Sequence, residues 1–107
     1  MLKEFTMNTR YKITRLNEQE EPMLTLEDFQ QFFSTQSDFT YEDAFVSRNQ
    51  EGVEMRIKGD FFMWHVDQVK VPFRFFDGEL YVAISHPVIE EKMKEIAAAL
   101  DAVYVEG

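Results

Sequence analysis

Residues that could bind a metal or move a proton come close together at one place in the sequence. His65 and Asp67 are two residues apart in a segment expected to be a strand, so their side chains would project to the same side. A first-row metal needs at least one further ligand, and His86 is the only other histidine. Because this spacing does not make three ligands converge, we favour an ordinary half-buried histidine and predict no metal site.

The adjacent Ser85 and His86 have the residue types of a nucleophile and its base. Neighbours in a chain rarely point at one another, and the sequence holds no phosphate-binding glycine loop, nucleophile elbow or zinc motif. Pro87 follows directly, so we expect one of the two residues to cap a helix instead. The sequence supplies no convergent acid, base or nucleophile. We therefore expect no cofactor and lean away from an enzyme, while leaving catalysis open.

An acidic segment is the first candidate binding surface. The chain has a net charge of −9, and residues 17–54 carry ten anionic side chains and one cationic one. Such a surface would steer association with a basic partner protein. We predict a small acidic protein-binding domain, of inhibitor or immunity type. Its expected contacts are Glu18, Glu20, Glu21, Glu27 and Asp28. The alternative is a solvated loop followed by acidic residues that stabilise the start of a helix.

The face of the sheet opposite the helices is the second candidate. Strand alternation places cationic and aromatic side chains there: Arg10, Lys12, Arg56, Lys58, Lys70, Arg74, Phe76 and Tyr81. The second prediction is thus a small-molecule or anion-binding domain with contacts from Arg56, Lys58, Arg74 and Tyr81. Glu54 and Glu79 share the face, so a solvated, ion-paired sheet is the alternative. The net charge of −9 disfavours nucleic acid.

The helices and strands that would position these residues are expected to form one α+β domain over residues 1–107. Hydrophobic periodicity gives the order β-α-β-β-β-β-β-α-β, a two-layer sandwich with two helices on one face of a mostly antiparallel sheet. The expected strands span about 9–16, 41–48, 53–58, 61–66, 71–76, 79–84 and 103–105, and the helices about 26–33 and 87–102. Gly59-Asp60 is taken to separate the third and fourth strands. A helical crossover would place the last strand parallel to a neighbour.

Two local signals set the register and the first helix. Asp77-Gly78 predicts a type I′ hairpin with Phe73, Phe75, Leu80 and Val82 buried on one face. Pro72 should loosen the ladder because it cannot donate a hydrogen bond. Thr25 followed by Asp28 approximates a capping box at the start of the first helix.

Composition bounds the remaining expectations. The chain has no cysteine and no apolar stretch long enough to span a bilayer, so we predict a cytoplasmic protein with no membrane partner. A short final strand would leave a pairable sheet edge. A homodimer formed through that edge is therefore the expected assembly, beside a separate partner protein.

Overall fold

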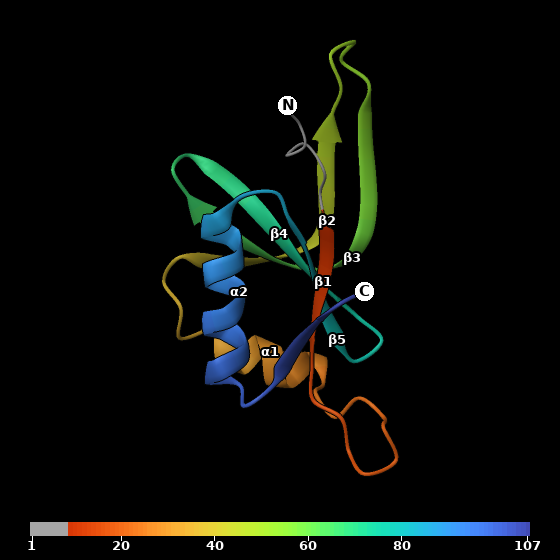
Figure 1. Cartoon of the computed structure of the whole chain (residues 1–107). Coiled ribbons are helices and arrows are strands. Elements are labelled where there is room, and N and C mark those ends of the chain that lie inside the picture. The colour runs from red at the N-terminus through yellow and green to blue at the C-terminus, as the bar shows by residue number, and fades with distance from the viewer. Residues whose placement is uncertain (1–8) are drawn as a thin grey trace.

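A computed structural model describes residues 9–107 as a six-stranded sheet with two helices (Figure 1). The strands follow one another across the sheet in the order β2-β3-β4-β5-β1-β6, and every neighbouring pair is antiparallel. The elements are β1 (Thr9–Thr14), α1 (Leu26–Phe33), β2 (Phe39–Arg48), β3 (Glu54–Val66), β4 (Val69–Phe76), β5 (Glu79–Ile84), α2 (Pro87–Ala99) and β6 (Val103–Glu106).

Both helices pack on the same side of the sheet, around one core. Phe29 of α1 and Met93 of α2 are fully buried and join one cluster with Phe62, Phe73 and Leu80 of the sheet. Burying several aromatic side chains there gives the sandwich its main apolar driving force. The predicted α+β sandwich with two helices on one face is confirmed.

The element order differs from the prediction at β3, which runs unbroken through Gly59-Asp60. Between Glu42 and Ala44 of β2, the paired residue on β3 moves from Phe61 to Lys58, so β3 carries one extra residue. A β-bulge of this kind bends a strand without ending it. The two strands expected around Gly59-Asp60 are therefore one, and the prediction counted one strand too many.

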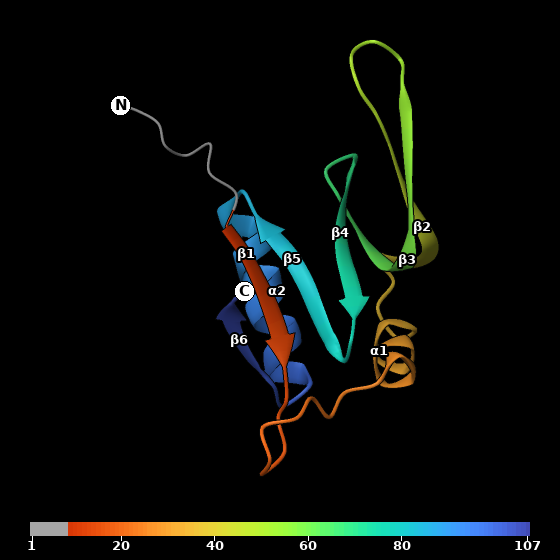
Figure 2. The ribbon, with the colours of Figure 1, turned by 90° about the vertical axis from the view of Figure 1, so that its right-hand side faces the viewer.

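Beyond this bulge, β2 and β3 continue as a two-stranded projection. We call residues 44–58 the arm. Figure 2 shows it extending past the ends of β4 and β5. Asn49 closes its tip, where its side-chain oxygen accepts hydrogen bonds from the main-chain N–H groups of Glu51 and Val53, each at 2.9 Å. The positive φ of Gly52 completes the turn.

The last strand also departs from the prediction. β6 pairs with β1 in an antiparallel ladder, from Tyr11↔Glu106 to Thr14↔Val103. It is parallel to β5, but β1 lies between them. The position beside β5 is already taken by β1, so the crossover through α2 must pass over that strand. β6 remains an exposed sheet edge, and homodimerisation through it stays a prediction.

The β4–β5 hairpin agrees with its predicted register. Phe76 pairs with Glu79, and Asp77 and Gly78 have φ values of 51° and 82°, as a type I′ turn requires. The predicted face is buried at Phe73, Leu80 and Val82 and half-buried at Phe75. Pairing with β5 stops at Arg74↔Tyr81, two residues after Pro72, whereas the β3–β4 ladder continues unbroken through Met63↔Pro72. The expected loosening at Pro72 is therefore limited to the β5 side.

Both helix starts carry side-chain caps. The Thr25 hydroxyl accepts from the N–H of Asp28 at 3.1 Å, and the Asp28 carboxylate accepts from the N–H of Thr25 at 2.9 Å. This capping box confirms the prediction for α1. At α2 the cap is His86, whose Nδ1 accepts from the N–H of Val88 at 3.3 Å.

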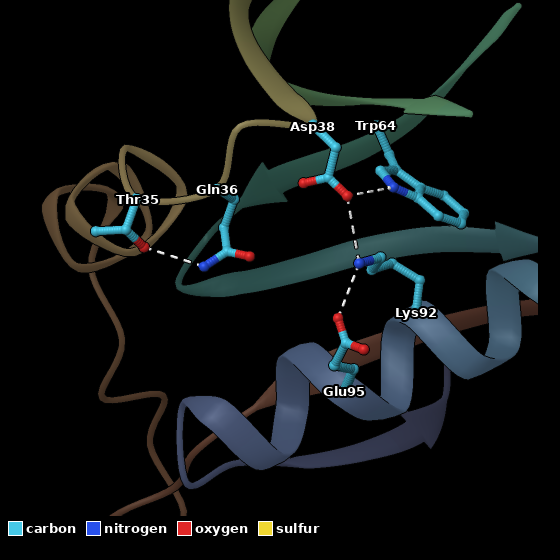
Figure 3. A network of polar contacts seen from close by, with 6 residues as sticks. All are labelled: Thr35, Gln36, Asp38, Trp64, Lys92 and Glu95. Atoms are coloured by element: carbon cyan, nitrogen blue, oxygen red, sulfur yellow. Dashed lines mark hydrogen bonds and ion pairs between the residues drawn. The ribbon is translucent and has the colours of Figure 1, made fainter. Parts of the chain in front are cut away.

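A polar network attaches α2 to the sheet (Figure 3). The Asp38 carboxylate accepts from the Trp64 indole at 3.0 Å and lies 3.4 Å from Nζ of Lys92, which also contacts Glu95 at 2.8 Å. Burial by itself would raise the pKa of Asp38, but the hydrogen bond from Trp64 and the charge of Lys92 outweigh it and lower that pKa. The ionised carboxylate therefore stabilises this junction.

Candidate functional site

A hollow of about 390 Å³ opens on the face of the sheet opposite the helices. It lies over β1, β3, β4 and β5. Two cationic, three aromatic and three small apolar side chains line it: Arg10, Arg74, Phe61, Phe76, Tyr81, Pro72, Val82 and Ala83. We call it the Arg74 hollow. Its volume is within the range of small-molecule sites, roughly 300–1,000 Å³.

Arg74 is held in the hollow by two aromatic rings. Its guanidinium carbon lies 5.4 Å from the ring centroid of Phe61 and 5.5 Å from that of Phe76. A β-carbon at Gly59 would lie only 3.1 Å from Nε of Arg74, so glycine leaves the room that the guanidinium occupies. Cation–π contacts and this close packing fix the guanidinium at the wall of the hollow.

The hydrogen-bonding capacity of Arg74 is largely unused. Among the described residues, Nε has no hydrogen-bond partner and no exposed surface, and Nη2 makes only a long contact of 3.5 Å with the main-chain oxygen of Lys58. Among residues 9–107, no carboxylate forms an ion pair with Arg74. An anion bound at the Nη groups would supply the charge-assisted hydrogen bonds that this guanidinium lacks among these residues.

A second group of charges borders the hollow and is neutralised internally. Oε1 of Glu79 accepts from Nζ of Lys12 at 3.2 Å and from the Tyr81 hydroxyl at 3.1 Å. Burial, followed by the hydrogen bond to Glu79, raises the pKa of Tyr81, so its phenol stays neutral. Arg10 lies 5.2 Å from the ring centroid of Tyr81. Glu79, which contacts Tyr81 of the hollow, is thus paired, whereas Arg74 has no acidic partner among residues 9–107.

The predicted cationic contacts are divided by the fold. The hollow brings Arg74 and Tyr81 together. Arg56 and Lys58 lie on the arm, beyond the bulge, and only the main-chain oxygen of Lys58 reaches Arg74. Sequence reasoning omitted Arg10 and Phe61 from the candidate site. Alternation placed Arg10 on the correct face, but Phe61 appeared only as part of an apolar run.

The predicted acidic contacts lie in two separate segments. Glu18, Glu20 and Glu21 are exposed in the loop after β1, coloured orange in Figure 1. Asn17 shapes this loop, since its side-chain oxygen accepts from the N–H groups of Gln19 and Glu21 at 2.8 and 3.0 Å. In α1, Glu27 is exposed, whereas the carboxylate of Asp28 belongs to the capping box.

The residues weighed as metal ligands or catalytic groups serve local structure. Nε2 of His65 is 2.8 Å from the Thr40 hydroxyl, and Asp67 forms a tight turn with Gln68, both at positive φ. His86 is the cap of α2. Within residues 9–107, no three histidine or acidic side chains gather closely enough to hold a metal ion.

Comparison of the chain with protein-family models, curated proteins and solved structures finds no match. None of the helices described by the structure is both long and apolar enough to cross a membrane. The chemistry of the site therefore has to be argued from its own residues.

Proposed function

We propose that this protein is a binding domain whose Arg74 hollow takes an anionic group, a carboxylate in particular, attached to an apolar body. The observation that carries the proposal is the guanidinium of Arg74, which lies between two aromatic rings without an acidic partner among the described residues. Arginine presents its N–H groups as a planar fork that matches a carboxylate.

The rest of the hollow suits the remainder of such a ligand. Phe61, Phe76 and Tyr81 offer aromatic surface for an apolar body. Arg10 adds positive charge, and Glu79 is already bound to Lys12 and Tyr81 and so repels an anion less. Nucleic acid is disfavoured as the ligand because the chain has a net charge of −9.

Titration with benzoate tests this function, because benzoate joins a carboxylate to a flat apolar ring. We expect saturable changes in the amide NMR signals of Phe61, Phe76 and Tyr81 in the wild type. Arg74→Gln should weaken binding at least about tenfold, since the charged hydrogen bonds are lost. Arg56→Gln removes the same charge from the arm and should leave binding unchanged. Equal affinity in the two variants would refute the assignment.

A second candidate function is the docking of a basic partner protein on the acidic loop. The hydrogen bonds to the Asn17 side chain favour this candidate, because they fix the loop shape while Glu18, Glu20 and Glu21 remain exposed. Such a surface is typical of inhibitors that associate rapidly by electrostatic steering. A chain without cysteine suits a reducing compartment, so we place this partner in the cytoplasm.

Charge reversal separates this candidate from a merely solvated loop. Glu18, Glu20 and Glu21 changed together to Lys should slow association with a captured partner at least about tenfold at 0.1 M salt, and less at 1 M salt. A control variant with Glu51, Glu91 and Glu106 changed to Lys has the same change in net charge, and these residues are exposed outside the loop. Stopped-flow association rates that fall equally in both variants would exclude a specific role for the loop.

A further inference from the structure

The arm has two chemically different faces. Residues that pair across a ladder share a face, and the register sets Ser47 opposite Met55 and Phe45 opposite Ile57. These side chains form an apolar strip of Phe45, Met55 and Ile57. The other face carries the cations Arg48, Arg56 and Lys58 together with Ala44, Val46 and Glu54.

A two-stranded ribbon is only marginally stable by itself. The apolar strip of the arm nevertheless stays largely exposed and adds little buried surface to it. Met55 is 57% exposed and Ile57 is 38% exposed. A contiguous exposed apolar strip on a projecting element is typical of a binding surface, because a partner that covers it removes that surface from water.

The strip is continuous with the Arg74 hollow. The ring of Phe45 lies 5.7 Å from that of Phe61, and Phe61 in turn lies 5.4 Å from the guanidinium carbon of Arg74. The two contacts together span at most about 11 Å, which four residues of extended chain can cover at ~3.3 Å per residue. Side chains four positions apart point to the same side of an extended chain, so one segment could contact both Arg74 and the strip.

We propose that the occupant of this combined surface is an extended segment of another protein. Its acidic side chain would bind Arg74, and an apolar side chain four positions away, on the same side of the extended segment, would pack on the strip. The proposal rests on the function assigned to the Arg74 hollow and names its ligand. Arg74 has no acidic partner among residues 9–107, and its charge selects an acidic segment. The chain of contacts from Arg74 through Phe61 to Phe45 selects a peptide over a compact small molecule.

A capped peptide with glutamate and leucine four positions apart, acetyl-Gly-Glu-Ser-Ser-Ser-Leu-Gly-amide, is the probe for NMR titration. We expect it to bind at least about tenfold more tightly than a control peptide with serine in place of leucine, because burial of the leucine adds to the carboxylate contact. Paired substitution of Met55→Ser and Ile57→Ser should abolish that preference while leaving benzoate affinity unchanged.

The controls keep the two proposals distinguishable. Val103→Ser changes an apolar side chain that is 58% exposed on β6, and it should leave both affinities unchanged. Loss of benzoate binding in the Met55 and Ile57 double variant, despite a wild-type circular dichroism spectrum, would overturn the division of roles. Equal affinities for the two peptides would overturn the peptide assignment but leave the benzoate site standing. A concentration-dependent dimer that the double variant loses would show instead that a second copy covers the strip.

Discussion

Arg74 illustrates how much one residue depends on its neighbours for its chemistry. Its position on the open face follows from the alternation of β4 and could be predicted. That no residue of 9–107 forms an ion pair with Arg74 could not be predicted, because it depends on which strands lie beside β4. Phe61 reaches Arg74 only through the pairing of β3 with β4, a contact between residues 13 apart in sequence.

Tyr41 offers a test of electrostatics at the scale of single residues. Its hydroxyl donates a hydrogen bond to Asp60, and this bond, followed by burial and the charges of Asp60 and Asp43, raises the pKa of Tyr41 to about 12. The raised pKa means that the interaction stabilises the fold fully below the unfolded value of 10.0 and is lost as the pH rises toward 12.

We therefore expect Tyr41→Phe to lower the free energy of unfolding at pH 8 by about 1 kcal/mol or less, as for an exposed hydrogen bond. The difference between variant and wild type should shrink between pH 10 and 12. Urea unfolding across this range measures it. A difference that is the same at pH 8 and pH 11.5 would contradict the hydrogen bond to Asp60 as its source.

At the scale of elements, the sequence patterns that correctly predicted structure were those that depend on neighbouring residues. Thr25 caps α1, and Asp77-Gly78 sets the β4–β5 register, because cap and turn chemistry involve residues near in sequence. Asp67-Gln68 forms a second tight turn without glycine and gave no such signal. Gly59-Asp60 gave a misleading one, since a bulge and a strand end favour similar residues.

The docking of α2 supplies a prediction at this scale. The lowered pKa of Asp38 means that its ion pair and indole hydrogen bond contribute stability above the unfolded value of 3.8. This contribution is lost as the pH falls through the lower, folded pKa. Asp38→Asn should therefore reduce stability at pH 7, by less than about 1 kcal/mol for so exposed a pair.

Near pH 2 the Asp38→Asn variant and the wild type should have the same free energy of unfolding, because both side chains are then neutral. Urea unfolding at pH 7 and at pH 2 measures the two stabilities. The fluorescence of Trp64, the one tryptophan of the chain, follows the unfolding. Burial of Trp64 beside Asp38 makes its emission sensitive to this junction. A destabilisation that persists undiminished at pH 2 would show that shape, and not charge, holds α2 in place.

For the whole molecule, the fold class could be predicted from the pattern of helices and strands. The separation of Arg56 and Lys58 from Arg74 could not, because it depends on the tertiary structure. Strand alternation grouped Arg56 and Lys58 with Arg74, but the bulge in β3 sends the first two onto the arm. The acidic loop after β1 and the Arg74 hollow remain two different surfaces. The proposed ligand supplies the anion that Arg74 lacks among residues 9–107.

The Nη–H groups of Arg74 test this proposal most directly, because Nε has no exposed surface for a ligand to reach. In the benzoate titration, the Nη–H NMR signals should move downfield and saturate together with the amides of Phe61 and Tyr81. Such a shift is the signature of a new, charge-assisted hydrogen bond. Nη–H signals that stay unchanged while benzoate saturates the protein would place the anion elsewhere and contradict the proposed site.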